Sequence, residues 1–164
     1  MFSIYRIGFV DATEKGPQID QMVLGVKMVL EDGASHAVDS SDLAFKTCAR
    51  LAFRDAFMKA GPTILQPIMK AEIAVPIEFQ GGTIAQLAKR RAVIVDTEPS
   101  GGMVTITCEV PLNAMFGYST ELRSATEGKG EFDMEFMKYR PVTRDELETI
   151  KKEVKELNSQ KQIL

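Results

Sequence analysis

The single histidine is the first side chain in this sequence whose setting suggests chemistry. His36 ends a polar loop, Glu31–His36, that contains a glycine. An imidazole in such a loop can stack on nucleic-acid bases and donate to phosphate or ribose hydroxyl groups without a perturbed pKa. No acids or thiols lie near it at metal-ligand spacing, so we expect no metal site. The alternative interpretation is an exposed histidine without a role.

Two cysteines are the next candidates, as nucleophiles or metal ligands. Cys48 and Cys108 both lie in apolar, structured segments and lack metal-ligand spacing. A nucleophile–base pair of Cys48 with His36 is an alternative, but nothing around this thiol indicates a lowered pKa. We therefore expect two buried, free thiols in a reducing compartment and no catalysis by this chain.

Three cations recur at every fourth residue, Lys46, Arg50 and Arg54, so one face of a helix would carry them all. Asp42 and Asp55 lie nearby in the sequence and could neutralise part of this charge. A solvated helix face is the alternative interpretation. The net charge of −3 argues against non-specific binding to a phosphate backbone. Any RNA contact must therefore come from local patches.

Nucleotide-binding and membrane-spanning classes are not favoured by the sequence. The phosphate-loop pattern G-x-x-x-x-G-K-[ST] does not occur, because Gly81-Gly82 and Gly101-Gly102 are short and lack the lysine. No apolar run approaches the roughly 20 residues that span a bilayer, and the N-terminus does not resemble a signal peptide. The 164 residues, 45% of them hydrophobic, fit one medium or two small globular domains.

The elements that position these residues fall into two groups, of which the first is short. Met22–Leu30 reads as a strand. A helix is predicted to begin at Asp39, whose carboxylate would accept from free backbone N–H groups, and Asp42 would complete a capping box. Good helix formers then continue to Lys59, and Gly61-Pro62 ends the helix.

The second group has the order strand–helix–strand–strand–helix–strand over about 68–140. Apolar and polar residues alternate in the predicted strands, and the predicted helices run over 79–91 and 113–124. This order is the ferredoxin-like, split β-α-β arrangement. A capping box from Thr143 to Glu146 then predicts a C-terminal amphipathic helix.

Two blocks of the sequence resemble translation elongation factor G, the GTPase that drives tRNA–mRNA translocation on the ribosome. The first block, Gly33–Lys46, resembles the distal loop and the following helix of the family's domain IV. The second block, Leu65–Tyr139, resembles domain V and includes the specific run FGYSTELRS, which combines a helix-interior glycine, a tyrosine and an arginine. Within the family, the sequence of these motifs most resembles the mitochondrial factor and its bacterial sister group.

The resemblance implies an α+β chain with three parts. Residues 1–64 would be a partial domain IV, a ribosomal-S5-domain-2-like β-α segment with a tip loop at 31–41 and a helix at 40–60. Residues 65–141 would be the ferredoxin-like domain V, and 142–164 a C-terminal helix and tail. The family's first strands of domain IV would precede Met22, so we expect the first domain to be incomplete and to expose apolar surface.

The resemblance also implies a function and a set of contacts. The chain would be the ribosome-binding C-terminal part of the factor, with its tip loop in the decoding region beside the mRNA and tRNA of the A site. GTP and magnesium would bind the GTPase domains elsewhere in the full-length protein, and those domains would also be partners of this chain. The implied ribosome or RNA contacts are Ser35, His36, Val38, Asp39, Lys89, Arg90, Arg91 and Arg123, with the basic helix face Lys46, Arg50 and Arg54.

The sequence departs from the family pattern in places. Many members carry an aromatic residue before the tip histidine and an acid after it, where this chain has Ser35 and Ala37. The family's Arg-Arg-Gly is Arg90-Arg91-Ala92 here, and Ala92 adopts a positive φ less easily than glycine, so the turn is expected to differ.

Alternative functions remain open at this point. They are the ribosome-recycling paralogue of the same family, an inhibitor that occupies the factor site, and a ferredoxin-like regulatory module that binds a small ligand. We expect a bacterial cytoplasmic protein, with the mitochondrial matrix as the alternative, and no membrane partner.

Overall fold

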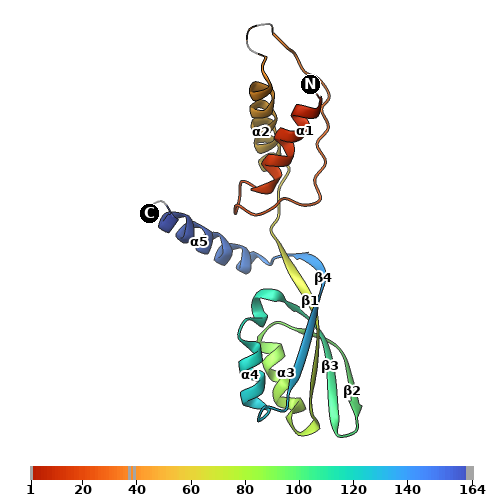
Figure 1. Cartoon of the computed structure of the whole chain (residues 1–164). Coiled ribbons are helices and arrows are strands. Elements are labelled where there is room, and N and C mark those ends of the chain that lie inside the picture. Colours follow the sequence, from red (N-terminus) through yellow and green to blue (C-terminus); the bar gives the residue numbers. More distant parts are fainter. Residues whose placement is uncertain (1, 37, 39, 162–164) are drawn as a thin grey trace. The chain divides into compact units, whose positions relative to one another are not determined.

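The computed structural model describes residues 2–36, 38 and 40–161 (Figure 1). The chain divides into two compact units. The helical unit comprises Met1–Thr63 together with Arg144–Leu164, and the sheet unit comprises Ile64–Thr143.

The helical unit contains two long helices that pack against each other, α1 (Phe2–Glu14) and α2 (Asp42–Lys59). Aromatic rings line this contact: the ring centroids of Tyr5 and Phe45 lie 5.2 Å apart, and Phe9 meets the buried Phe53 edge-on at 5.4 Å. The backbones approach closely at Gly8, where an added Cβ would lie 2.6 Å from the carbonyl oxygen of Lys46. The glycine therefore permits the crossing.

The start of α2 corrects the sequence prediction. The N-cap is Ser41, whose side chain accepts a hydrogen bond from the N–H of Ala44 at 3.2 Å. The prediction that the helix begins at Asp39 is therefore wrong, because a serine nearer the apolar run supplies the same capping oxygen. Asp39 itself lies outside the described residues. The predicted end is confirmed: Ala60 is the C-cap and Gly61 follows with φ +69°.

The segment Met22–Leu30 is irregular chain rather than the predicted strand. A strand requires a hydrogen-bonded neighbour, and every strand that the structure describes belongs to the sheet unit. Several apolar side chains of the segment are consequently exposed, among them Met22, Val26 and Val29.

The sheet unit has the predicted β-α-β-β-α-β order, which confirms the α+β, ferredoxin-like arrangement of this part of the chain. Its four antiparallel strands lie in the order β2-β3-β1-β4, and α3 and α4 lie on one face of the sheet (Figure 1). The elements are β1 (Leu65–Pro76), α3 (Gln80–Lys89), β2 (Val93–Ser100), β3 (Met103–Pro111), α4 (Tyr118–Ala125) and β4 (Glu131–Pro141).

The core lies between the sheet and these two helices. Ile73 of β1 and Ile106 of β3 are directly opposite each other in the ladder and fully buried, together with Leu87, Tyr118 and Leu122 of the helices. This burial confirms the predicted alternation along β1 and β3. The charged side chains of the opposite face form surface ion pairs, Lys70 with Glu72 at 2.7 Å and Lys138 with Glu109 at 2.8 Å.

The predicted helix over 113–124 is divided in two. A 3-10 turn, η2 (Leu112–Met115), is followed by Phe116 and Gly117, and α4 begins only at Tyr118. Gly117 is the N-cap of α4 with φ +74°, so the interpretation of a helix-interior glycine is wrong. A left-handed residue changes the direction of the chain, which a continuous helix does not allow.

Two further elements complete the described chain. A 3-10 turn, η1 (Ile77–Phe79), precedes α3, and the predicted C-terminal helix is present as α5 (Arg144–Lys161). Residues 162–164 of the predicted tail lie outside the described residues.

Candidate functional site

Two hydrogen bonds between His36 and Ser40 close the tip loop, and the described side chains of the loop are exposed. The N–H of His36 donates to the hydroxyl of Ser40 at 2.6 Å, and the N–H of Ser40 donates to the carbonyl oxygen of His36 at 3.2 Å. Ser35 and His36 are exposed, and Val38 is 86% exposed. The loop thus holds the backbone of His36 while its imidazole remains available to a partner. Ala37 and Asp39 lie outside the described residues.

The basic face of α2 carries less free charge than its spacing predicts. Lys46 forms an ion pair with Asp11 of α1 at 2.5 Å, whereas Arg50 and Arg54 are exposed. Asp55, expected to neutralise this face, pairs with Lys59 at 2.6 Å. The partner of Lys46 was missed because it lies on another helix, far away in the sequence.

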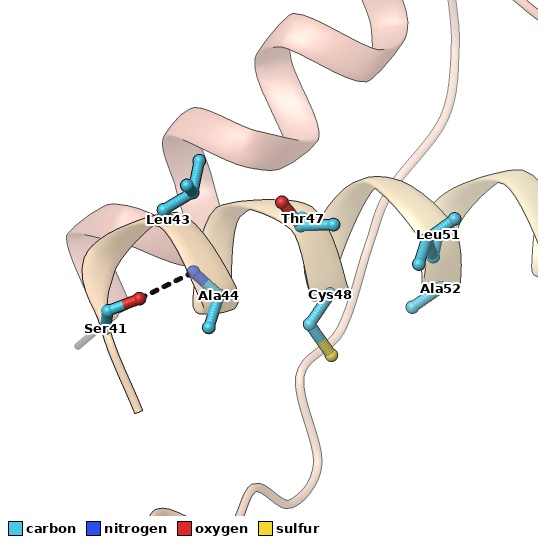
Figure 2. A pocket seen from close by; sticks show the side chains of 7 residues that line it. All are labelled: Ser41, Leu43, Ala44, Thr47, Cys48, Leu51 and Ala52. Carbon is cyan, nitrogen blue, oxygen red and sulfur yellow. Dashed lines mark hydrogen bonds between the residues drawn. The ribbon is translucent and has the colours of Figure 1, made fainter. Parts of the chain in front are cut away.

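Cys48 corrects the expectation of two buried thiols, because it is exposed whereas Cys108 is buried. A residue next to Ala49, which faces α1, is rotated by about 100° around the helix and so leaves the contact. Cys48 borders a shallow depression of about 560 Å³ along α2 (Figure 2). The depression is lined by Ser41, Leu43, Ala44, Thr47, Cys48, Leu51 and Ala52.

Arg90, one of the predicted contact residues, is bonded within its own unit. Its guanidinium donates to the carbonyl oxygens of Ala114 and Phe116 and to the carboxylate of Glu121, and it lies 5.1 Å above the ring of Tyr118. Only 18% of its side chain is exposed. Arg90 therefore joins the end of α3 to the loop before α4, and this structural role was not predicted from the sequence.

The end of α3 places two more cations on the surface. The N–H groups of Arg91 and Ala92 donate to the carbonyl oxygens of Ala88 and Leu87, which is the Schellman pattern. Arg91 is the left-handed residue with φ +60°, so the turn requires no positive φ at Ala92. Lys89 and Arg91 are both exposed.

The run FGYSTELRS divides into two core residues, Tyr118 and Leu122, and several surface residues. Tyr118 is fully buried, and burial raises the pKa of its hydroxyl to about 12. Phe116 is 74% exposed, so of the two aromatic residues in this run only Tyr118 lies in the core of the unit. Arg123 of α4 is exposed. The sequence did not reveal the break at Gly117.

Metal and membrane sites are not evident in the part of the chain that the structure describes. There, no three side chains among His, Cys, Asp and Glu gather as metal ligands. Nor does any described helix combine the length and apolar character needed to cross a membrane.

Most of the chain matches models of known families and the sequences of known proteins. The family model "Elongation factor G, domain IV" matches residues 5–61, and "Elongation factor G C-terminus" matches residues 63–150. Elongation factor G 2 of Bdellovibrio bacteriovorus is 53% identical over 88% of this chain, and elongation factor G 1 of Syntrophus aciditrophicus is 50% identical over 90%. The chain spans 21% of each of these relatives.

A solved structure shows the same fold. The crystal structure of a protein from Thermus thermophilus superposes with a TM-score of 0.85 and 32% sequence identity. The match covers 94% of this chain and 24% of the other.

Proposed function

The chain belongs to the elongation factor G family, and we propose that it is the ribosome-binding C-terminal part of a factor that acts in tRNA–mRNA translocation. The observation that carries the proposal is the succession of two family models, domain IV over 5–61 and the C-terminus over 63–150. Both belong to one factor and occur here in one chain without a long gap.

The proposed role of the helical unit is steric. Its tip loop enters the decoding region, and His36 contacts RNA of the A site while Ser35, Val38 and Asp39 contribute the remaining surface. The exposed imidazole and the closed backbone of the loop support this proposal, because a preorganised loop loses little conformational entropy on binding. Resistance to back-sliding then needs no chemical step in this chain.

The proposed role of the sheet unit is to bind ribosomal RNA through the end of α3. Lys89 and Arg91 are exposed there and can pair with phosphates, and Arg123 of α4 is exposed on the same unit. Arg90 acts chiefly by holding the adjoining loop, since its guanidinium already has three oxygen partners.

Catalysis is proposed to reside outside this chain. GTP and magnesium would bind the factor's GTPase domains, and those domains would be the intramolecular partners of the two units described here. The two bacterial relatives favour a bacterial cytoplasmic factor over a mitochondrial one. The assignment of this chain to the subgroup of the mitochondrial factor and its bacterial sister group stays a prediction.

Co-sedimentation with vacant ribosomes at moderate salt tests the proposal. We expect saturable, salt-sensitive binding that weakens in His36→Ala and in Lys89→Ala. Lys129→Ala is the matched control, because Lys129 already lies 3.7 Å from Glu78 and 3.5 Å from Glu127 in its own unit. Circular dichroism would verify that each variant is folded.

The result has two informative outcomes. Binding that all three variants retain would place the contacts elsewhere on the chain. Absence of binding by the folded chain would contradict the proposal and direct attention to the small-ligand alternative for the ferredoxin-like unit.

A further inference from the structure

Ser40 closes the tip loop with two different groups. Its hydroxyl accepts a hydrogen bond from the N–H of His36 at 2.6 Å, and its own N–H donates to the carbonyl oxygen of His36 at 3.2 Å. His36 forms no other hydrogen bond with a described residue. One serine, four residues later in the chain, therefore holds the backbone of the tip histidine at both its N–H and its carbonyl group.

The next residue, Ser41, connects this closed loop to the packed helices. Its hydroxyl caps α2 by accepting from the N–H of Ala44 at 3.2 Å. The helix is fixed in turn, because Ala49 and Phe53 are buried where α2 packs against α1. Two adjacent serines thus have separate tasks: Ser41 starts the helix, and Ser40 ties the tip loop to that start.

The hydroxyl of Ser40 is expected to affect binding more than folding. Its hydrogen bond lies in solvent, where water replaces a lost partner at little cost to stability. Its larger effect concerns the conformational freedom of the loop. A free backbone loses entropy when it binds, whereas a loop that is already held has lost that entropy during folding.

We propose that Ser40 is a positioning residue for the tip, one that holds the backbone from which the imidazole of His36 reaches RNA; this rests on the proposed function. Two other roles make different predictions. A role in folding predicts that replacing Ser40 lowers stability. A direct contact of the exposed hydroxyl with RNA predicts an effect on binding that does not depend on His36.

A double-mutant cycle on the 164-residue chain separates these roles. The variants are Ser40→Ala, His36→Ala and the two combined, and co-sedimentation with vacant ribosomes at moderate salt gives each Kd. We expect Ser40→Ala to weaken binding about fivefold, the usual net contribution of one hydrogen bond. In the His36→Ala background the same change should have less than about a twofold effect, because no imidazole remains to be positioned.

Two further variants control the experiment. Ser40→Thr keeps the hydroxyl group, so its Kd should stay within about twofold of the parent. Ser100→Ala is the matched control, because Ser100 is an exposed serine at the end of β2, outside the proposed contact regions. It should change neither the Kd nor the Tm. Thermal melts should also give Ser40→Ala the Tm of the parent.

Backbone relaxation measured by NMR tests the positioning without ribosomes. The order parameter of the His36 N–H should be about 0.85 in the parent, the value of a rigid backbone, and below about 0.6 in Ser40→Ala. Ser40→Thr should restore the rigid value. An order parameter at His36 that Ser40→Ala leaves unchanged overturns the positioning role.

The outcomes of the binding experiment separate this proposal from the proposed function. Ribosome binding that Ser40→Ala leaves unchanged overturns the positioning role but not the proposed function. An equal loss with and without His36 also overturns it, because the hydroxyl would then contact the ribosome on its own, and a lowered Tm would assign Ser40 to folding. If the parent chain does not bind ribosomes, the proposed function fails, and the order parameter alone decides whether Ser40 holds the tip.

Discussion

Thr126 joins the end of α4 to the start of β4 through one hydroxyl group. The hydroxyl donates to the carbonyl oxygen of Leu122 at 2.7 Å and accepts from the N–H of Gly130 at 2.8 Å. Both bonds are fully buried, since Thr126 is 0% exposed. Gly130 belongs to this arrangement, because an added Cβ there would lie 2.7 Å from the same oxygen.

Replacing Thr126 with valine should therefore lower the free energy of unfolding by about 1–3 kcal/mol, because the N–H of Gly130 would be left buried without an acceptor. Valine has nearly the shape of threonine, so the packing changes little. Urea unfolding followed by circular dichroism measures the change. The exposed Thr120→Val is the control and should have almost no effect. Equal stabilities of the two variants would contradict this account.

Two buried groups at the centre of the sheet unit, a tyrosine hydroxyl and a cysteine thiol, make its stability depend on pH in alkaline solution. Burial raises the pKa of the Tyr118 hydroxyl to about 12 and that of the Cys108 thiol to about 11. Cys108 and Glu121 raise the tyrosine's pKa further, and Arg90 opposes them. In the unfolded chain both groups lose their protons at lower pH than in the folded chain. The free energy of unfolding therefore falls as the pH rises from the unfolded-state pKa towards the folded-state pKa of each group.

The sign of the effect is fixed by these raised values. Stability should be unaffected by the Tyr118 hydroxyl below about pH 10 and should decline from pH 10 towards 12. Tyr118→Phe should match the parent at neutral pH, because the hydroxyl has no hydrogen-bond partner in the described structure. It should then lose less stability between pH 10 and 12. Thermal melts across this range measure the difference, and parallel declines would contradict the assignment.

At the scale of single residues, the sequence indicated which side chains could be functional better than it indicated their burial and their bonding partners. The internal role of Arg90 was not predicted, because its partners Ala114, Phe116 and Glu121 come from a different helix–loop segment. Cys48 was placed in the core because its segment is apolar, although the helical angle turns it to the surface.

At the scale of elements, the crossing of α1 and α2 depends on one missing side chain. Gly8→Ala would place a methyl group 2.6 Å from the carbonyl oxygen of Lys46 and 3.0 Å from the Cβ atom of Ala49. Backbone atoms of α2 cannot move aside cheaply, so we expect a loss of about 1–3 kcal/mol. Gly81→Ala on α3 is the matched control, because nothing lies within 4 Å of its added Cβ.

The two alanine variants should differ in sign. Alanine is a better helix former than glycine, so Gly81→Ala should stabilise its unit by about 0.5–1 kcal/mol. Differential scanning calorimetry of both variants beside the parent provides the comparison. A neutral or stabilising Gly8→Ala would mean that the helices separate or slide readily, and the close approach would then not be needed.

Alternation and capping signals account for what the sequence predicted about the elements. β1 and β3 were predicted because their apolar residues face one layer of helices. Exposed ends of strands, such as Glu98–Ser100 in β2, carry little hydrophobic pattern from which a strand could be predicted. Met22–Leu30 shows the converse: a strand pattern forms no strand where the described chain offers no neighbour for it.

At the scale of the whole molecule, a net charge of −3 has to be reconciled with binding to RNA. Ion pairs reconcile the two: acids neutralise cations such as Lys46, Lys70 and Lys138 within the units, and other, exposed cations provide the proposed contacts with RNA. Apart from Arg91, which has an interaction partner of its own, the exposed cations in the proposed contact regions are Arg50, Arg54, Lys89 and Arg123.

These four cations predict the salt dependence of ribosome binding. Each phosphate contact contributes about −0.7 to the slope of log K against log salt for single-stranded RNA, so four contacts give about −3 and a roughly sevenfold loss of affinity per doubling of salt. Arg50→Ala combined with Arg54→Ala should reduce the slope by about 1.4, because two contacts are lost. Lys46→Ala should leave it unchanged, since Lys46 is paired with Asp11. Sedimentation binding curves at several salt concentrations measure the slope. If Lys46→Ala reduced it as much as Arg50→Ala, the ion pair between the helices would not persist on the ribosome, and the basic face would act as the undivided row of charges that its sequence spacing predicts.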